Sequence, residues 1–294
     1  MEQYNGWLVI DKDLHMSSAK VVHLVKKMLK AKKVGHSGTL DPLATGILPI
    51  AIGEATKLTQ YAMDQEKEYI FTVDFGSATS TDDLEGEVIA SSSFRPIKDQ
   101  ISDILPLFIG KIQQAPPIYS AIKVAGQRAY DLARSGNLSE LPAREILIKE
   151  IELLSYEQDR SSFRVKCGKG TYVRSLARDI GLKLGTYGHV SFLRRTRTGK
   201  FSLENAFSLD KLENIVHNPE TKEFLLSVNI VLDDIPVLEV TDLQVLDLRY
   251  GRFIMPEFEF CNNKLVQALD GNGKLIALGQ SYDNCFKPTR IFNH

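Results

Sequence analysis

One stretch of the chain decides the fold: Gly35-His36-Ser37-Gly38-Thr39-Leu40-Asp41-Pro42-Leu43-Ala44-Thr45-Gly46 leads directly into the apolar run 47–52. The apolar run predicts a buried strand. Glycines in the preceding loop allow positive φ angles and a close approach of the backbone to a ligand, while Pro42 disfavours helical geometry at Asp41. The stretch therefore indicates a stiff loop that presents an aspartate, although Asp-Pro and glycine are also the usual residues of a plain turn.

Patterns of strand and helix lie on both sides of this loop. Residues 7–10 are typical of a short strand, and Ser17-Ser18 offers a cap for a helix with one apolar side. Strict alternation in Tyr69, Phe71, Val73 and Phe75 marks another strand. Further strands are predicted at 146–154, 163–167 and 190–193, with a helix between the last two. We therefore expect an α+β fold, a mixed β-sheet with flanking helices.

The pattern changes near residue 232. Short apolar runs separated by turns follow, including the turn Asp270-Gly271-Asn272-Gly273. We predict two domains, 1–231 and 232–294, of which the second is small and rich in β-structure.

Composition describes an ordinary globular protein. Of its 294 residues, 43% are hydrophobic and 25% charged. No run approaches the roughly 18 apolar residues that a membrane helix needs, and the first five residues lack the regions of a signal peptide. The three cysteines form no Cys-x-x-Cys pair. A reducing, cytoplasmic location without membrane attachment is therefore expected.

The net charge of −1 conceals two local concentrations of positive charge. Locally concentrated basic charge suits contacts with phosphate, whatever the global sum, although two solvated faces would look the same. We define the first basic cluster as Lys26, Lys27, Lys30, Lys32, Lys33 and His36, and the second as Arg194, Arg195, Arg197 and Lys200.

A second motif, Lys169-Gly170-Thr171-Tyr172-Val173-Arg174-Ser175-Leu176, predicts the start of a helix. Arg174 falls in the first turn, where a positive charge is unfavourable unless an anion lies near. Asp41 is an available partner. A surface arginine, or a pair with Asp179 or Asp83, explains the pattern equally simply.

Tyr69, on the alternating strand, has two interpretations. The common one is packing in the core with the hydroxyl bonded, and the other is stacking on an extruded base. The six histidines never fall at the spacing of metal ligands, and no GxxxxGK[ST], GxGxxG or HExxH motif is present. We therefore expect chemistry without a cofactor and without a metal.

Taken together, these motifs resemble those of the TruB-type tRNA pseudouridine-55 synthases. The stretch 35–46 is similar to the family's catalytic loop, where threonine is usual at the position of Ser37. The likeness spans about residues 6–210. The motifs that follow at the family's spacing are Gly53-Glu54-Ala55-Thr56-Lys57, Lys67-Glu68-Tyr69, Ala115-Pro116-Pro117-Ile118-Tyr119-Ser120-Ala121-Ile122-Lys123 and Lys169-Gly170-Thr171-Tyr172-Val173-Arg174.

The resemblance implies roles for single residues. Asp41 matches the catalytic aspartate, Tyr69 the tyrosine that stacks on the target base, and Arg174 the arginine that pairs with the aspartate. A further group matches residues that hold flipped-out bases or line the target pocket: His36, Tyr172 and Leu193. The final domain looks like the small PUA-type RNA-binding domain of many members.

One departure lies near the start of the chain. The family usually has Asp-Lys-Pro-x-Gly where this chain has Asp11-Lys12-Asp13-Leu14-His15. The proline and glycine typical of the local turn are therefore replaced by Asp13 and His15.

The resemblance implies a pseudouridine-synthase-type sheet and a cofactor-free isomerisation of uridine 55 in the T-loop of tRNA. Asp41 could attack C6 of the base, attack C1′ of the ribose, or remove a sugar proton. The tRNA T-stem-loop is the implied partner, and the protein is expected to be a monomer without an obligate protein partner. Two alternatives are an RNA-binding module without catalysis and an enzyme directed by guide RNA. A pure binder needs no buried acid, and the chain lacks long basic tails.

Overall fold

A computed structural model describes residues 4–120, 122–124, 126–135, 141–216, 224–255, 263–282 and 285–293. Ala121, within one of the quoted motifs, lies outside them. Ten strands form the main sheet, in the order β14-β1-β3-β12-β4-β11-β10-β7, with β13 beside β12 and β2 beside β3.

The centre of this sheet combines parallel and antiparallel neighbours. Strand β3 (Ala44–Ile52) is antiparallel to β1 (Gly6–Lys12) and parallel to β12 (Gly188–Thr198). Strand β12 in turn is antiparallel to β4 (Lys67–Phe75). The sequence-predicted loop therefore ends on a central strand, and a parallel pair of this kind lies in the buried part of a sheet.

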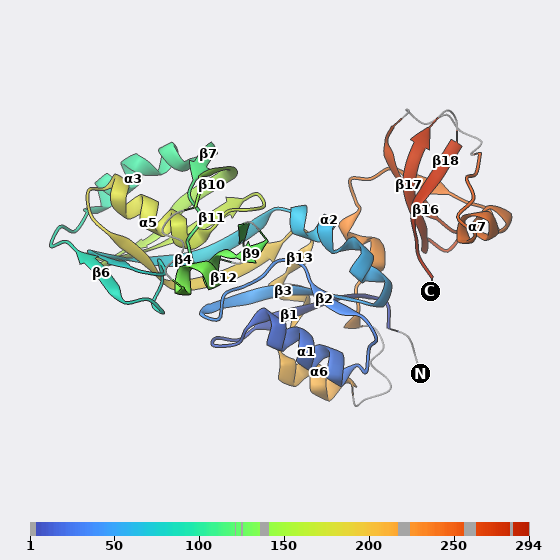
Figure 1. Cartoon of the computed structure of the whole chain (residues 1–294), viewed down its shortest axis with the longest axis horizontal. Coiled ribbons are helices and arrows are strands. Elements are labelled where there is room, and N and C mark those ends of the chain that lie inside the picture. The colour runs from blue at the N-terminus through green and yellow to red at the C-terminus, as the bar shows by residue number, and fades with distance from the viewer. Residues whose placement is uncertain are drawn as a thin grey trace.

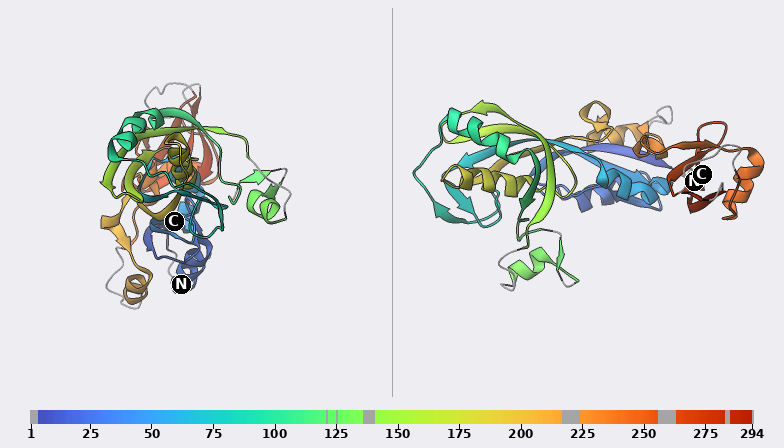
Figure 2. Two further views of the ribbon diagram at one scale, coloured as in Figure 1. Left: turned by 90° about the vertical axis from the view of Figure 1, so that its left-hand side faces the viewer. Right: turned by 90° about the horizontal axis from the view of Figure 1, so that it is seen from above.

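Helices cover the sheet in two groups (Figures 1 and 2). Helix α1 (Ser18–Met28) lies beside α6 (Leu209–Val216) below the β1–β3 region, and α5 (Val173–Lys183) packs on β12 and β4. Ser17 caps α1, since its hydroxyl accepts a hydrogen bond of 3.2 Å from the Lys20 amide. The apolar side of α1 is buried as its period requires.

The remaining helices and strands complete the main domain. Figure 2 shows α4 standing away from the body of the sheet. Their bounds are η1 (Gly53–Leu58), α2 (Thr59–Asp64), β2 (Val34–His36), β5 (Ser77–Thr79), β6 (Val88–Ser91), α3 (Lys98–Ile104), η2 (Leu105–Phe108), β7 (Gly110–Gln114), β8 (Lys123–Val124), β9 (Gln127–Arg128), α4 (Ala129–Arg134), β10 (Arg144–Tyr156), β11 (Arg160–Cys167), β13 (Phe201–Ser202), η3 (Leu203–Asn205), β14 (Ala206–Phe207) and η5 (Val228–Val231).

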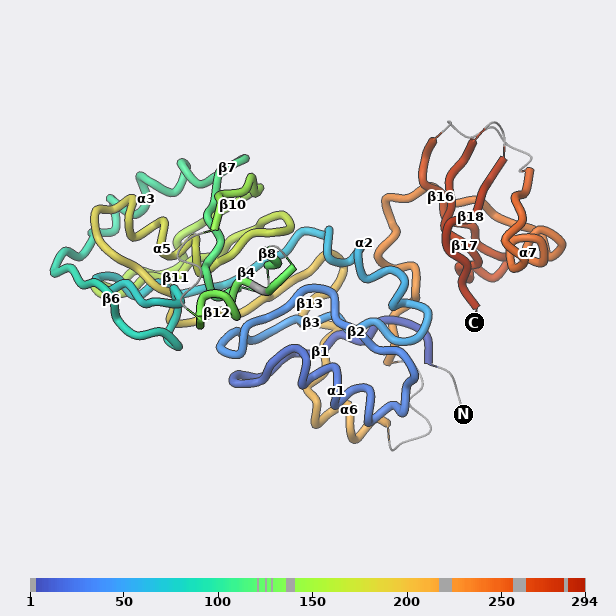
Figure 3. Tube along the Cα trace, in the orientation of Figure 1, coloured from blue at the N-terminus to red at the C-terminus, as the bar shows by residue number. Residues whose placement is uncertain are grey.

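A second, four-stranded sheet forms the end of the chain (Figure 3). One apolar cluster joins Trp7 and Phe201 of the main domain to Leu278 and Phe292 of this sheet. Complete burial of a side chain such as Phe292 contributes about 1.5–3 kcal/mol. The elements of this part are β15 (Val237–Glu239), α7 (Asp242–Arg249), β16 (Leu265–Leu269), β17 (Leu275–Tyr282) and β18 (Cys285–Ile291).

The predicted fold class is confirmed: a mixed sheet with flanking helices is followed by a β-rich C-terminal domain. The domain boundary at 231/232 stays a prediction. Among the described residues, no helix is long and apolar enough to cross a membrane.

Gly46 offers a test of how tightly β3 and β12 pack. Its φ is +98°, and an added Cβ would lie 2.1 Å from the Arg195 carbonyl oxygen on β12. We expect Gly46→Ala to lower the free energy of unfolding by at least about 3 kcal/mol, measured by urea denaturation, because both the strain and the clash fall on paired backbone.

Gly35→Ala is the matched control, since a Cβ at Gly35 meets nothing within 4 Å. It should change stability by less than about 1 kcal/mol. Equal effects of the two substitutions would show that the β3–β12 contact is not closely packed.

Candidate active site

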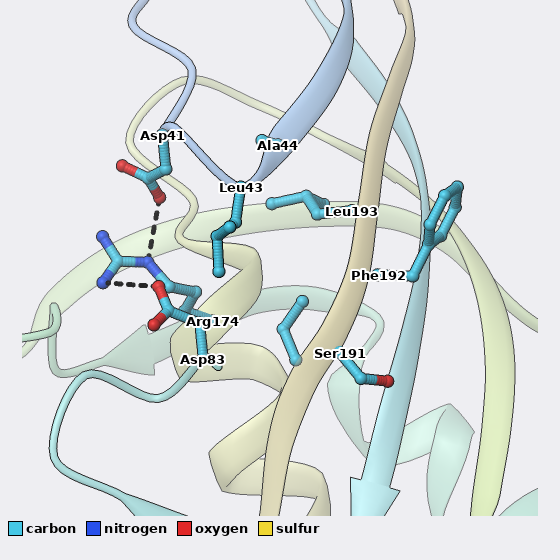
Figure 4. Close-up of a pocket in the computed structure, with 9 residues that line it drawn as sticks. Asp41, Leu43, Ala44, Asp83, Arg174, Ser191, Phe192 and Leu193 are labelled. Carbon is cyan, nitrogen blue, oxygen red and sulfur yellow. Dashed lines mark ion pairs between the residues drawn. The ribbon is translucent and has the colours of Figure 1, made fainter. Parts of the chain in front are cut away.

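A small pocket lies where the Asp41 loop, the start of α5 and strand β12 meet (Figure 4). The loop contributes Asp41, and α5 contributes Arg174. The lining is completed by Leu43, Ala44, Asp83, Val190, Ser191, Phe192 and Leu193. One wall is therefore apolar, and a group of charged side chains lies opposite it.

Asp41 and Arg174 point toward each other across this pocket (Figure 4). Arg174 Nε lies 2.9 Å from Asp41 Oδ2, with the Arg174 side chain 7% exposed and that of Asp41 38% exposed. The Nε–H does not point at the oxygen closely enough for a hydrogen bond, so the contact is an ion pair. A buried cation thus holds a carboxylate that remains open to solvent.

The rest of the Arg174 guanidinium is bound by the protein. Nη1 donates to the Thr81 carbonyl at 2.9 Å, and Nη2 to the Tyr119 carbonyl at 3.1 Å. Nη1 also lies 3.5 Å from Asp83 Oδ2. These contacts fix the planar fork and hold Nε at ion-pair distance from Asp41.

Arg174 sits in the first turn of α5, as predicted, and two carboxylates offset the unfavourable helix dipole. Tyr172 caps the helix, and its amide and carbonyl exchange hydrogen bonds of 2.8 and 3.1 Å with the Gln114 side chain. The start of α5 is thereby fixed to strand β7.

Asp83 is the charged residue of the pocket to which the sequence assigned no site role. Only 4% of it is exposed, and its carboxylate also accepts hydrogen bonds from Thr81 and the Glu85 amide. In the sequence it belongs to an acidic group with Asp82 and Glu85 and was an alternative partner for Arg174. Both pairings occur, because Arg174 lies between Asp41 and Asp83.

The loop of Asp41 is tied to the N-terminal turn. The Leu40 amide donates to Ser18 Oγ at 2.9 Å, and the His15 amide donates to the Pro42 carbonyl at 2.8 Å. Lys12 Nζ donates to the Met16 carbonyl at 2.7 Å, and burial lowers the pKa of Lys12 to about 8. His15 adopts a φ of 61°, so this turn places a histidine in the left-handed region that glycine favours.

The second basic cluster requires a correction, because three of its four charged groups are bound by other groups of the protein. Strand alternation points Arg195 inward, where Nε donates to the Ile47 carbonyl at 2.7 Å and Nη2 to the Gly38 carbonyl at 3.0 Å. Arg194 pairs with Asp11 at 2.6 Å, and Lys200 with Asp233 at 2.8 Å. Arg195 therefore supports the Asp41 loop and does not face phosphate.

The first basic cluster is different. Its five lysines are exposed, and none forms an ion pair with a residue that the structure describes. His36 stands apart from them, half-buried on β2, where burial and then the Arg195 charge lower its pKa. Its Nδ1 has no hydrogen-bond partner within the described part of the chain.

The other predicted site residues surround Asp41 at different depths. Leu193 lines the pocket, whereas Tyr69, Tyr172 and His36 are not among its lining residues. Tyr69 lies on β4 directly opposite Arg195, with a partly exposed surface and an enclosed hydroxyl. Burial raises the pKa of both tyrosines, and the Asp41 charge acts in the same direction. Both hydroxyls therefore stay protonated near neutral pH.

Among the described residues, no group of histidine, cysteine, aspartate and glutamate side chains could hold a metal ion. The charged groups of the pocket are Asp41, Asp83 and Arg174. Such a site can supply a carboxylate held in place by a fixed cation, beside an apolar wall that suits a planar base.

Comparison with known proteins gives a consistent result. Residues 26–173 match the model of the N-terminal domain of TruB family pseudouridylate synthases, and residues 174–234 match a tRNA pseudouridylate synthase B C-terminal domain. The tRNA pseudouridine synthase B of Caulobacter vibrioides is 45% identical, with 98% of this chain and 96% of the relative covered. That of Ehrlichia ruminantium is also 45% identical, with 98% and 99% covered.

Solved structures agree in fold. The chain is similar to one in a Cbf5-Nop10-Gar1 complex, with a TM-score of 0.75, 25% identity, and 98% of this chain and 84% of that chain covered. A chain of an H/ACA RNP bound to a substrate RNA containing 2′-deoxyuridine gives a TM-score of 0.76 at 24% identity, with 98% and 85% covered.

The Arg174 fork provides a test of the site's construction. Arg174→Lys keeps the charge but cannot bind two carbonyls and two carboxylates at once, so we expect a loss of about 2–3 kcal/mol in the free energy of unfolding. Arg160→Lys is the control, because Arg160 is 55% exposed and pairs with Asp74 at 3.5 Å. It should change stability by less than about 0.5 kcal/mol. Equal losses in urea denaturation would contradict a special role for the fork.

Proposed function

Since the chain belongs to the TruB family of pseudouridylate synthases, we propose that it converts uridine 55 in the T-loop of tRNA to pseudouridine, with Asp41 as the catalytic residue. The pairing of Asp41 with the buried Arg174 carries this proposal. Relatives named tRNA pseudouridine synthase B support tRNA as the substrate.

The reaction breaks the bond between ribose C1′ and uracil N1, turns the base, and rejoins it through C5. The uracil must first leave its stack, which costs a few kcal/mol and calls for an apolar or aromatic site. Leu193 in the pocket wall and the ring of Tyr69 supply such surfaces. Tyr172 and the neutral, half-buried His36 complete the group that we assign to binding of the flipped bases.

Asp41 acts in its ionised form. Attack on C1′, attack on C6 and removal of a sugar proton all begin with a carboxylate oxygen, and Arg174 supplies a positive charge 2.9 Å from that group. Asp83 shares the same cation from its other side. This arrangement keeps Arg174 from closing fully over Asp41, whose side chain stays 38% exposed for the substrate.

A proton must leave C5 once the new bond has formed. Tyr69 and Asp41 are the two candidates for the base that accepts it. Because burial raises the pKa of Tyr69, its hydroxyl holds a proton near neutral pH. We therefore assign stacking to Tyr69 and acceptance of the C5 proton to Asp41.

Binding of the rest of the tRNA falls to exposed positive charge. The five lysines of the first basic cluster directly precede the Asp41 loop in the sequence, and their charge suits contacts with the phosphates of the tRNA. We assign residues 1–231 to the catalytic domain and 232–294 to a PUA-like RNA-binding domain. The enzyme is proposed to act as a cytoplasmic monomer, without a cofactor, a metal or an obligate protein partner.

Asp41→Asn should abolish isomerisation while it leaves RNA affinity within about tenfold of the original, because the amide keeps the shape but removes the reactive charge. The measurement is release of tritium from C5-labelled uridine in a T-stem-loop RNA, with sequencing to locate the modified site. Filter binding of the same RNA reports affinity.

Asp64→Asn is a matched control, since Asp64 has a similar exposure of 42% and one ion pair, with Lys169. It should release tritium at the original rate. Appreciable turnover by pure Asp41→Asn protein would refute the assignment of Asp41, and an unmodified T-loop with the original protein would refute the proposed substrate.

Tyr69 separates stacking from proton transfer. Tyr69→Phe keeps the ring and should retain the affinity for the stem-loop, whereas Tyr69→Ala should weaken binding by about 1–3 kcal/mol, the usual value of one base–aromatic stack. Both affinities are measured by filter binding in the Asp41→Asn background. Equal affinities of the two variants would argue against stacking on Tyr69.

A further inference from the structure

A polar crevice lies far from the Asp41 pocket, where β18 of the C-terminal sheet meets η1 and α2 of the main domain. Its lining includes Lys57 and Arg290, together with the hydroxyl groups of Thr56, Thr59 and Thr289. None of its lining residues is acidic. Thr56 and Lys57 belong to the motif Gly53-Glu54-Ala55-Thr56-Lys57, no residue of which lines the Asp41 pocket.

This motif clamps the end of β18 onto the main domain. Lys57 Nζ donates to the Ile291 carbonyl at 2.6 Å and pairs with Glu54 at the same distance. Glu54 Oε2 also accepts a hydrogen bond of 2.7 Å from the Asn293 amide. Lys57 further lies 5.4 Å from the centre of the Phe292 ring. The two walls of the crevice are thus fixed relative to each other.

Arg290 supplies the free positive charge of the crevice. It is exposed, donates a hydrogen bond to the Lys57 carbonyl, and lies 5.9 Å from the centre of the Tyr61 ring. No carboxylate among the described residues pairs with it. At the start of η1, the Gly53 amide donates a hydrogen bond of 2.9 Å to the Lys33 carbonyl, which ties the end of the lysine-rich segment to η1.

The threonine hydroxyl groups of the crevice already donate their protons in hydrogen bonds to backbone carbonyls. Thr56 Oγ1 donates to the Gly53 carbonyl at 2.7 Å, Thr59 Oγ1 to the Thr56 carbonyl at 3.2 Å, and Thr289 Oγ1 to the Leu278 carbonyl at 2.9 Å. Their oxygens are left as acceptors. A ligand that brings both an anion for Arg290 and hydroxyl donors for the threonines fits this pattern, and the ribose-phosphate backbone of RNA is such a ligand.

We propose that this crevice binds the sugar-phosphate backbone of the substrate RNA at a point outside the loop that enters the Asp41 pocket. The Gly53–Lys57 clamp positions the two walls, and Arg290 makes the phosphate contact. The inference rests on the proposed function, because it names a second contact for the same RNA.

Arg290→Ala is the test, with affinity for whole tRNA measured by filter binding over a series of salt concentrations. We expect the affinity for tRNA to fall about threefold or more at low salt. The negative slope of log affinity against log salt should become shallower by about 1, because one phosphate contact is lost. Arg290→Lys should retain most of the affinity.

Arg249→Ala is the control, since Arg249 is exposed on α7, on the side of the C-terminal domain away from α2 (Figure 1). It should leave both affinity and slope unchanged. An unaltered slope for Arg290→Ala, or an equal loss with Arg249→Ala, would overturn the proposal. A stem-loop that the original protein does not modify would instead refute the proposed function, while the tRNA affinities would still test the crevice.

Discussion

The site depends on one shared cation. Arg174 is nearly buried, and its guanidinium lies between Asp41 and Asp83 while Nη1 and Nη2 each donate a hydrogen bond to a backbone carbonyl. Removing a charge from water is costly unless it is paired and hydrogen-bonded, so losing any of these four contacts would leave the buried charge less well compensated. The consequence for chemistry is that Asp41 keeps an exposed carboxylate whose orientation the protein interior determines.

Several parts of the fold hold Arg174 and the Asp41 loop in place. Helix α5 begins at the point where Arg174 can face the pocket, and Gln114 holds that beginning in place. A second buried arginine, Arg195, supports the carbonyls of Gly38 and Ile47 on either side of the Asp41 loop. Gly46 allows β12 to approach closely enough for this support. The geometry of the site therefore rests on two buried arginines, of which Arg174 pairs with the carboxylates and Arg195 holds the backbone of the loop.

Local patterns in the sequence predicted what local forces determine. Alternation over 69–75 and the cap at Ser17 gave correct positions for β4 and α1, since side-chain period and capping act within a few residues. The misplaced charge of Arg174 even indicated a nearby anion. The sequence could not decide between Asp41 and Asp83 as that anion. Only the packing of α5 on β12 and β4 brings the loops of both aspartates to one arginine. The inward direction of Arg195 was missed for a similar reason, as a run of arginines looks like a surface until the register of β12 is known. At His15 the chain lacks the family's glycine, and only the structure shows that the histidine adopts a left-handed backbone conformation.

The central claim is that Asp41 meets a uridine extruded from its stack beside Tyr69 and Leu193. The most direct test is the structure of the Asp41→Asn protein bound to a T-stem-loop RNA. We predict that the uracil of uridine 55 lies outside the loop's stack, against the Tyr69 ring. C1′ or C6 should then lie about 3–3.5 Å from the side chain at position 41. A bound RNA whose uridine 55 remains stacked, or whose extruded base occupies a site away from Arg174, would contradict the claim.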